Sequence, residues 1–410
     1  MSGSDRRLVI EGGESIVNFN SKAFKAVPES GIEDAVATMR TGMMFRYQPK
    51  KAENSHVSLF EKEFAAHLGS NFALGVNSCG AAMFIALNIA GVKPGDKVLS
   101  NGFTFTAVPS AIHHARAEPV FVESNWEWGL DVEDLENKVE ESGAKVLLLS
   151  YMRGHVPNMD AIMAVVKRHD LYLIEDCAHA FMTFWNGVKL GNFGRIACFS
   201  TQSSKGLSSG EGGILTTNDI EIAAKALLYA GSYEKRWNRH FGVDEEMMAN
   251  LQNQIPGYSM RMTEVCAALL RPQIPRLIEI YQIHRKNYLY LEGLLENHQN
   301  IEIPKPFPEV EMFCDTMQFH LRGLTRKQAD SFIEVMSLEG IDMQIFGVQR
   351  NARDFREWQF LKDIEAVELP ATVEAIEFAC DLSLQPHLNS SHMDVIAQVI
   401  CEVLAFVIKD

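Results

Sequence analysis

The sequence predicts an α/β protein with a large, mostly parallel sheet covered by helices and a smaller C-terminal α/β unit. From about residue 70 to residue 217, short apolar runs alternate with segments of helical periodicity, which is typical of a parallel sheet with helices on both faces. After Asn218 this alternation stops, and a smaller set of helix and strand patterns follows Asn300. A chain of 410 residues is long enough for two domains.

The elements of the first part follow one another at short intervals. Residues 72–78 form an apolar run that predicts a strand, and the small apolar residues at 81–91 predict a buried helix after it. Residues 131–143 have one polar face, and Asp131 is placed to cap that helix. The other expected elements are strands at 96–101, 117–124, 144–151, 171–176, 196–201 and 213–217, and helices at 106–115 and 158–170.

The second part is mostly helical before it returns to an α/β pattern. Residues 219–231 predict a helix, 232–246 a polar aromatic loop, and 263–298 a long helical segment interrupted by prolines. Strands are then expected at 317–324 and 341–347, and helices at 326–340 and 391–408. These patterns predict a large domain over 1–245, a helical connector over 246–300 and a small C-terminal α/β domain over 301–410. The first 15 or so residues are expected to be flexible.

Composition excludes several classes of protein. Apolar and charged contents of 47% and 22% are those of an ordinary soluble globular protein. The net charge of −15 argues against nucleic acid as a partner, because phosphate backbones need a basic footprint. The seven cysteines include no CxxC pair, so free thiols are expected and no metal site. No apolar leader or run of membrane-spanning length is evident, so a cytoplasmic location without a membrane partner is expected.

The stretch 199–213, FSTQSSKGLSSGEGG, looks least like ordinary packing. Lys205 lies among hydroxyl side chains, between an apolar strand and a glycine-rich turn that begins another apolar strand. A surface lysine is the ordinary interpretation of such a residue, but surface loops rarely lie between two such strands. A partly desolvated lysine has a lowered pKa, and its free amine can form a Schiff base with an aldehyde. The serines can donate to phosphate oxygens, and the glycines allow close approach of a flat group.

Two other groups lie where expected strands end, which is where open parallel sheets bind ligands. Ser78, Cys79 and Gly80 open a helix whose N–H groups can bind phosphate without a lysine, although small residues there often serve only tight packing. Asp176 ends a strongly apolar strand, where it either caps a helix or holds a cationic ring nitrogen. His179 follows three residues later and either faces the same pocket or is an ordinary interior histidine.

A phosphate cradle, a carboxylate for a ring nitrogen and a Schiff-base lysine together indicate pyridoxal 5′-phosphate. Residues 174–180 and 191–217, with 158–162 and 91–108 before them, resemble the DegT/DnrJ/StrS family of aminotransferases, which use this cofactor and are best known for amino sugars. The resemblance covers most of residues 35 to 275 and is most specific at the lysine loop. It implies the fold of aspartate-aminotransferase-like transferases, in which the large domain binds the cofactor.

The resemblance also implies a role for each matching residue. Lys205 forms the Schiff base, Asp176 faces the pyridinium nitrogen, and His179 lies near the ring hydroxyl. Phe105 stacks on the ring. The phosphate side is formed by Ser78, Cys79, Gly80 and Ser200.

The family shares its site across a dimer, which implies that this protein is a homodimer. The segment 256–264, which carries Ser259, then reaches the phosphate of the partner chain. The only basic side chain in that segment is Arg261, whose ordinary interpretation is an ion pair with Glu264. A side chain from the partner would help balance the phosphate charge, because no lysine or arginine lies between Ser78 and Ala90.

Four departures from the family pattern bear on the substrate and leave the cofactor assignment standing. Ser78-Cys79-Gly80 replaces Ser-Gly-Thr, and Ser259 stands where asparagine is common. Asn101 stands where proline is usual, and residues 151–155, YMRGH, replace a His-x-x-Gly pattern.

The expected reaction is transamination. A dehydratase branch of the family carries histidine in place of the lysine, so Lys205 favours amino transfer. Glutamate or glutamine is the expected donor, and an oxo-sugar, cyclitol or related small carbonyl compound the expected acceptor. Two alternatives stay open: elimination or replacement on an amino acid with the same cofactor, and a regulatory or scaffold protein that binds the cofactor without turnover.

Overall fold

The fold is taken from a computed structural model that describes residues 6–22, 26–348 and 350–409. Its centre is a seven-stranded sheet in the order β1-β9-β8-β5-β4-β2-β3. The strands are β1 (Phe72–Val76), β2 (Lys97–Asn101), β3 (Glu118–Val122), β4 (Val146–Ser150), β5 (Tyr172–Asp176), β8 (Ile196–Ser200) and β9 (Gly213–Thr217). All seven strands were expected from the sequence, and the α/β class is confirmed.

Strand β9 is the one reversed member of this sheet. It pairs antiparallel with β1 on one side and with β8 on the other, whereas the neighbours β8, β5, β4, β2 and β3 pair in parallel. Gly213 therefore lies opposite both Val76 and Ser200. Because β1 and β8 run in the same direction, their carboxyl ends meet the start of β9 at one edge. The loop 201–212 begins and ends at that edge.

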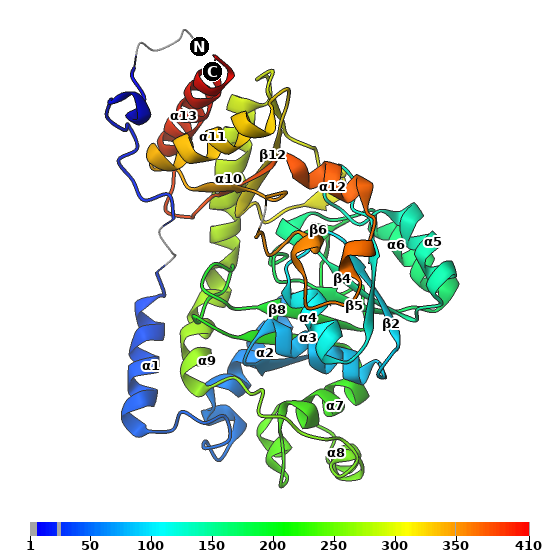
Figure 1. The fold of residues 1–410 in the computed structure, drawn as a ribbon. Coiled ribbons are helices and arrows are strands. Elements are labelled where there is room, and N and C mark those ends of the chain that lie inside the picture. Colours follow the sequence, from blue (N-terminus) through cyan, green and yellow to red (C-terminus); the bar gives the residue numbers. More distant parts are fainter. Residues whose placement is uncertain (1–5, 23–25, 349, 410) are drawn as a thin grey trace.

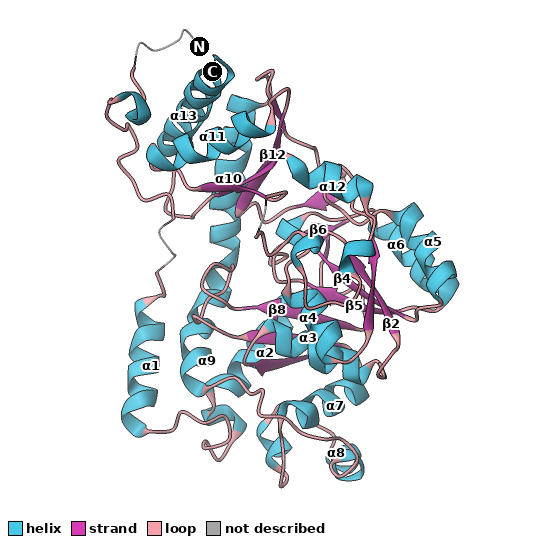
Figure 2. Cartoon of the chain, in the orientation of Figure 1, coloured by secondary structure: helices cyan, strands magenta, loops and turns pink. Residues whose placement is uncertain are grey.

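Helices cover both faces of the sheet, as Figure 2 shows with the magenta strands between cyan helices. Alternate strand residues enter two separate cores: Leu147 and Leu149 pack on one side, and Leu148 packs on the other. The helices of this part are α1 (Glu29–Thr41), α2 (His56–Leu68), α3 (Cys79–Ile89), α4 (Ala107–His114), α5 (Val132–Ser142), α6 (Met159–His169), α7 (Ile220–Ala230) and α8 (Glu245–Leu251). Asp131 caps α5 as expected, because its side chain accepts a hydrogen bond from the Asp134 N–H.

The C-terminal unit has a four-stranded antiparallel sheet, ordered β10-β12-β14-β13. Its strands are β10 (Ile301–Glu302), β12 (Thr316–Leu321), β13 (Met343–Ile345) and β14 (Ala379–Ser383), and its helices are α11 (Arg326–Leu338), α12 (Pro370–Glu377) and α13 (Ser390–Lys409). Helices α9 (Glu264–Leu270) and α10 (Leu277–Leu295) run from beside α1 to α13 (Figure 1). Strand β14 was not expected from the sequence.

A third, small sheet was also not expected. It joins β6 (Phe184–Trp185) and β7 (Val188–Lys189) of the first part to β11 (Val310–Glu311) of the second. The division into domains at residues 245 and 300 stays a prediction.

The N-terminal segment lies against the C-terminal unit (Figure 1). Arg6 forms ion pairs of 2.9 Å with Glu339 and 2.8 Å with Glu402, and the Ser15 hydroxyl donates to the Glu339 carbonyl at 2.6 Å. These contacts join Arg6 and Ser15 to the C-terminal unit, and the flexibility expected of the first 15 or so residues stays a prediction. Residues 1–5, included in that expectation, lie outside the described residues.

Two further expectations concern cysteines and membrane spans. All seven cysteines are free, and five of them are buried. Helix α13 is long and apolar enough to cross a membrane by length and composition alone, which corrects the expectation that no run reaches that length. It packs on α10 and α11 and buries Met393, Ile396, Ala397, Val399, Ile400, Val403, Leu404 and Val407.

Candidate active site

A cavity of about 760 Å³ opens at the edge of the sheet where β1, β5 and β8 end. Residues from both units line it. The sequence-predicted residues that it brings together are Ser78, Cys79, Gly80, Phe105, Asp176, His179, Ser200 and Lys205. Of the predicted site residues, only Ser259 is not among those that line this cavity.

The N-terminus of α3 faces the cavity next to the start of β9. The Ser78 side chain caps the helix by accepting a hydrogen bond from the Ala81 N–H at 3.0 Å, which leaves the first-turn N–H groups of Cys79 and Gly80 available to an anion. A side chain at Gly213 would lie 2.3 Å from the Ser78 carbonyl carbon and oxygen. Gly213 therefore has to be glycine, which explains part of the glycine-rich turn.

Gly212 explains a further part of the glycine-rich turn. Its φ of +155° disfavours other residues, and a side chain there would lie 2.3 Å from the Thr201 hydroxyl oxygen. The two glycines let the lysine loop return to the sheet directly beside the α3 N-terminus.

Asp176 is a buried carboxylate, 5% exposed, at the end of β5. Its Oδ2 accepts a hydrogen bond from the Ser150 hydroxyl at 2.8 Å, and its Oδ1 accepts one from the Ala178 N–H at 3.1 Å. Among the described residues no cation pairs with it, and burial raises its pKa. A turn follows β5 where a helix would have to begin, so the alternative role as a helix cap is not supported.

Asn101, one of the departures from the family pattern, supports Asp176 indirectly. Its side chain donates to the Ser150 carbonyl at 3.1 Å and accepts from the Ser150 N–H at 2.9 Å. This fixes the serine whose hydroxyl donates to Asp176.

Lys205 and His179 meet inside the cavity, with 2.9 Å between Lys205 Nζ and His179 Nε2. Burial, with a further contribution from the nearby Arg153, lowers the pKa of Lys205 to about 8. Burial, with a contribution from Lys205, holds the pKa of His179 well below its usual range. His179 is therefore neutral, and its ring nitrogen accepts a hydrogen bond from the lysine.

Phe105 and Ser200 lie on other parts of the cavity wall. Phe105 is 41% exposed, and the Arg353 guanidinium lies 5.6 Å from the centroid of its ring, which leaves part of the ring open to a flat group. Ser200 ends β8 opposite Gly213, on the same side as the α3 N-terminus. These groups fit a planar group with a phosphate at one end: the helix N-terminus would hold the phosphate, Asp176, which has no cation partner among the described residues, would face a protonated ring nitrogen, and Lys205 would face an aldehyde.

Ser259 lies on an exposed stretch, where it accepts a hydrogen bond of 3.1 Å from Arg261. Arg261 also donates to the Gly231 carbonyl at 2.9 Å, and its guanidinium lies 5.2 Å from the centroid of the Phe45 ring. The expected alternative, an ion pair between Arg261 and Glu264, is not formed. Glu264 instead accepts hydrogen bonds from Ser55 and the His56 N–H, both at 2.6 Å.

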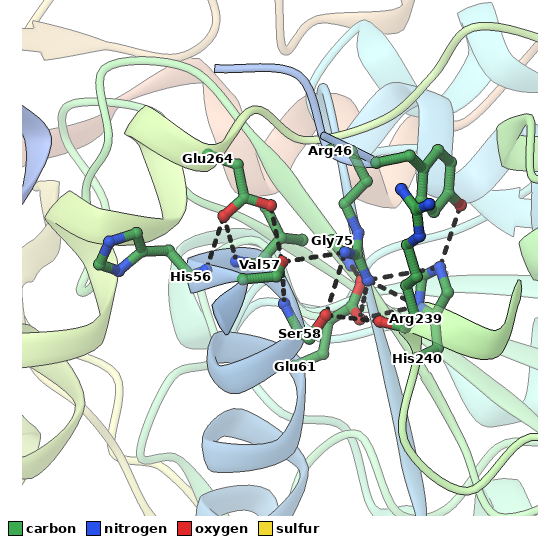
Figure 3. A network of polar contacts seen from close by, with 11 residues as sticks. Arg46, His56, Val57, Ser58, Glu61, Gly75, Arg239, His240 and Glu264 are labelled. Carbon is green, nitrogen blue, oxygen red and sulfur yellow. Dashed lines mark hydrogen bonds and ion pairs between the residues drawn. The ribbon is translucent and has the colours of Figure 1, made fainter. Parts of the chain in front are cut away.

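A buried polar network, which the sequence did not reveal, joins α2 to β1 and to the segments that carry Arg46 and His240 (Figure 3). Glu61 accepts hydrogen bonds from the Gly75 N–H at 3.0 Å and from Arg46 at 2.9 Å, and it lies 2.9 Å from His240 Nδ1. Burial alone would raise the pKa of Glu61, but Arg46 and His240 outweigh it and lower the pKa. The network ties the loop before α2 to β1, the strand that leads into Ser78.

Other cavity residues were also missed by sequence reasoning. Arg153 and Arg353 line the cavity together with Asp381 and Gln344. In the sequence, Arg153 was marked only by the departure of residues 151–155 from the family pattern. That departure did not indicate where the Arg153 side chain points. Arg353 and Asp381 come from the C-terminal unit, where no pattern marked them.

Comparison with known proteins agrees with this geometry. The model of the DegT/DnrJ/EryC1/StrS aminotransferase family matches residues 47–401. The chain is 35% identical over 249 residues to the spore coat polysaccharide biosynthesis protein SpsC of Bacillus subtilis, covering 60% of this chain and 61% of that protein. It is 30% identical over 260 residues to GDP-perosamine synthase of Escherichia coli O157:H7, covering 60% and 66%. The matches thus span less than two thirds of these relatives.

The fold is similar to that of a solved 3-amino-5-hydroxybenzoic acid synthase, with a TM-score of 0.80 and 25% identity. That similarity covers 94% of this chain and 99% of the other.

Proposed function

Because the chain belongs to the DegT/DnrJ/EryC1/StrS aminotransferase family, we propose that it transfers an amino group from glutamate or glutamine to an oxo-sugar, cyclitol or related small carbonyl acceptor. Members of this family use pyridoxal 5′-phosphate. The observation that carries the proposal is one cavity lined by Lys205, Asp176 and the α3 N-terminus. The names of the relatives, which refer to polysaccharide biosynthesis and perosamine, support a sugar-like acceptor.

Bound pyridoxal phosphate supplies an electron sink for the carbon that carries the amino group. Lys205 Nζ is the attachment point for its aldehyde and afterwards the base that moves the α-proton. Because the pKa of Lys205 is lowered to about 8, roughly half of this amine is unprotonated at pH 8 and less below it. His179 Nε2, at 2.9 Å, keeps the amine within the cavity.

Asp176 holds the proton on the ring nitrogen, since a buried carboxylate without a cation partner strongly favours a positive group beside it. The Ser150 hydroxyl and the Ala178 N–H hold the two carboxylate oxygens in position. The N–H groups of Cys79 and Gly80, with Ser200, bind the phosphate.

The experiment that tests the function is mass spectrometry of the pyridoxal-phosphate-loaded protein. It is incubated with glutamate or glutamine and a panel of keto-sugars, oxo-cyclitols and aldehydes. We expect a donor-dependent change in cofactor absorbance, followed by an acceptor that gains an amino group. Ammonia and an oxo-acid formed without any acceptor from an amino acid with a β-leaving group, such as serine, would indicate elimination, the alternative that the relatives' names do not support. No change with any donor would favour the regulatory or scaffold alternative.

We further propose that the protein is a homodimer with shared sites and works in the cytoplasm. The segment around Ser259 is exposed in one chain, although it holds the hydroxyl and guanidinium groups expected near a phosphate. The cradle at Ser78 has no basic residue of its own up to Ala90. A second copy that places Ser259 and Arg261 beside the cradle would balance the phosphate charge.

Mixing two inactive variants tests the shared site. Lys205→Ala and the double variant Ser259→Ala/Arg261→Ala are each expected to be inactive or severely impaired, for different reasons. After subunit exchange, a mixed dimer holds one site with both Lys205 and the partner's intact segment. We expect recovery of up to about a quarter of the wild-type sites, because half of the dimers are mixed and each has one working site. Wild-type protein that is active while it sediments as a monomer contradicts the proposal.

A further inference from the structure

Two arginines reach the cavity from different units of the chain. Arg153 lies in a turn after β4, at a φ of 54°, and Arg353 follows β13 in the C-terminal unit. Both line the cavity that holds Lys205. The roles proposed above for the cofactor residues use neither arginine.

Arg153 is held by the carboxylate of Asp381, which also accepts hydrogen bonds from two other side chains. One of its terminal nitrogens donates to Asp381. Asp381 also accepts hydrogen bonds from Gln318 and Gln344, each at 2.8 Å. The Nε of Arg153 is buried and has no partner among the described residues. The side chain is therefore held by Asp381 at the cavity wall.

Arg353 is fixed by its backbone and has no acidic partner. The Ala352 carbonyl accepts from the Thr106 N–H at 2.9 Å, and Asp354 forms a β-bridge with Phe103. The Arg353 guanidinium consequently lies over the Phe105 ring, at 5.6 Å from its centroid. Its Nε is buried without a partner, and no described carboxylate lies within ion-pairing distance.

The electrostatics of the pair also favour an anion. Burial, with a further contribution from Arg153, lowers the pKa of Arg353 to about 10. Both arginines are half-buried, and of the two only Arg153 forms an ion pair with a described carboxylate, that of Asp381. Arg353 is therefore a cation at the cavity wall without an ion-pair partner among the described residues. A bound anion would relieve the repulsion between the two guanidinium groups.

We propose that Arg153 and Arg353 form a subsite that binds a carboxylate of the substrate, an inference that rests on the proposed function. Guanidinium groups suit carboxylates because their N–H donors match the two oxygens. The carboxylate belongs either to the amino-acid donor or to an acidic acceptor. The cofactor phosphate is another anion that the two arginines could bind, but it has its own hydrogen-bond donors at Cys79, Gly80 and Ser200.

Calorimetric titration of the pyridoxal-phosphate-loaded protein with glutarate, which has carboxylates but no amino group, measures this subsite directly. Glutarate is expected to bind the wild type, and Arg353→Met is expected to weaken binding about 10- to 100-fold, the loss of a charge-assisted contact. Arg350→Met is the matched control because Arg350 is an exposed arginine in the same segment, and it should bind as the wild type does. Arg153→Gln provides a second variant that retains a hydrogen-bond donor for Asp381.

Three results would overturn the subsite: no glutarate binding to the wild type, equal binding by Arg353→Met, or a loss of cofactor affinity in Arg353→Met that matches the loss of glutarate. The half-reaction with glutamate distinguishes the two sources. If its saturation constant rises in Arg353→Met, the carboxylate is the donor's. If the constant is unchanged while acidic acceptors lose kcat/KM, the carboxylate is the acceptor's. Arginine-dependent glutarate binding without any amino transfer would refute the proposed function and leave the subsite standing.

Discussion

Lys205→Ala is expected to lower turnover by about 10⁴-fold or more, because it removes both the attachment point of the cofactor and the base that moves the α-proton. The variant should still bind pyridoxal phosphate, since the α3 N-terminus, Ser200 and Asp176 do not depend on the lysine. Steady-state amino transfer measures the first effect, and equilibrium binding of the cofactor measures the second.

Lys22→Ala is a suitable control for this variant. Lys22 also lines the cavity, but its ammonium pairs with Asp342 at 2.9 Å and its side chain is largely exposed. It should retain turnover. Reduction of the loaded wild type with borohydride, followed by peptide mapping, should place the label on Lys205. A label on any other lysine would refute the assignment.

Asp176→Asn is expected to lower kcat by about 10²- to 10³-fold with a smaller change in KM. The amide keeps the shape and one acceptor oxygen for Ser150 or Ala178. It removes the negative charge that keeps the ring nitrogen protonated, so the loss falls on the chemical step. Single-turnover rates with glutamate, measured over a range of pH, separate this effect from weaker binding.

Glu175→Gln is the matched control for Asp176→Asn, because Glu175 is the neighbouring buried carboxylate on the other face of β5. It accepts hydrogen bonds from Tyr151 at 2.7 Å and from the Gly194 N–H at 2.6 Å, away from the cavity. Its loss should lower the melting temperature and leave kcat per folded site within about threefold. Near-normal kcat in Asp176→Asn would show that Asp176 has only a structural role.

The sequence predicted the central sheet well because its inner strands are almost entirely buried and each strand reads as a short, mostly apolar run. It failed at β14, where the buried Asp381 interrupts the pattern. That carboxylate is tolerated because Gln318, Gln344 and Arg153 surround it, and these partners come from distant parts of the chain. The direction of β9 was also not foreseen, although the absence of a helical pattern between β8 and β9 was a signal for an antiparallel pair.

The residues expected to hold the cofactor could be brought to one cavity from the sequence because they lie in a local pattern, at strand ends and in a glycine-rich turn. Arg353 was not predictable in this way. Its position depends on the docking of the segment after β13 against Phe103 and Thr106, a tertiary contact without a local signal. The same holds for the network of Arg46, Glu61 and His240.

The reversed strand β9 has a consequence for the order in which the protein assembles during synthesis. β1 pairs in the sheet only with β9, whose residues lie about 140 positions later in the chain. Until the ribosome has released Thr217, β1 therefore has no sheet partner, although the strands from β2 to β8 are already available to pair. The phosphate cradle at Ser78 and the lysine loop are completed in the same event, the insertion of β9 between β1 and β8. A nascent chain that ends before β9 can form most of the sheet. In it, neither the cradle at Ser78 nor the lysine loop is complete.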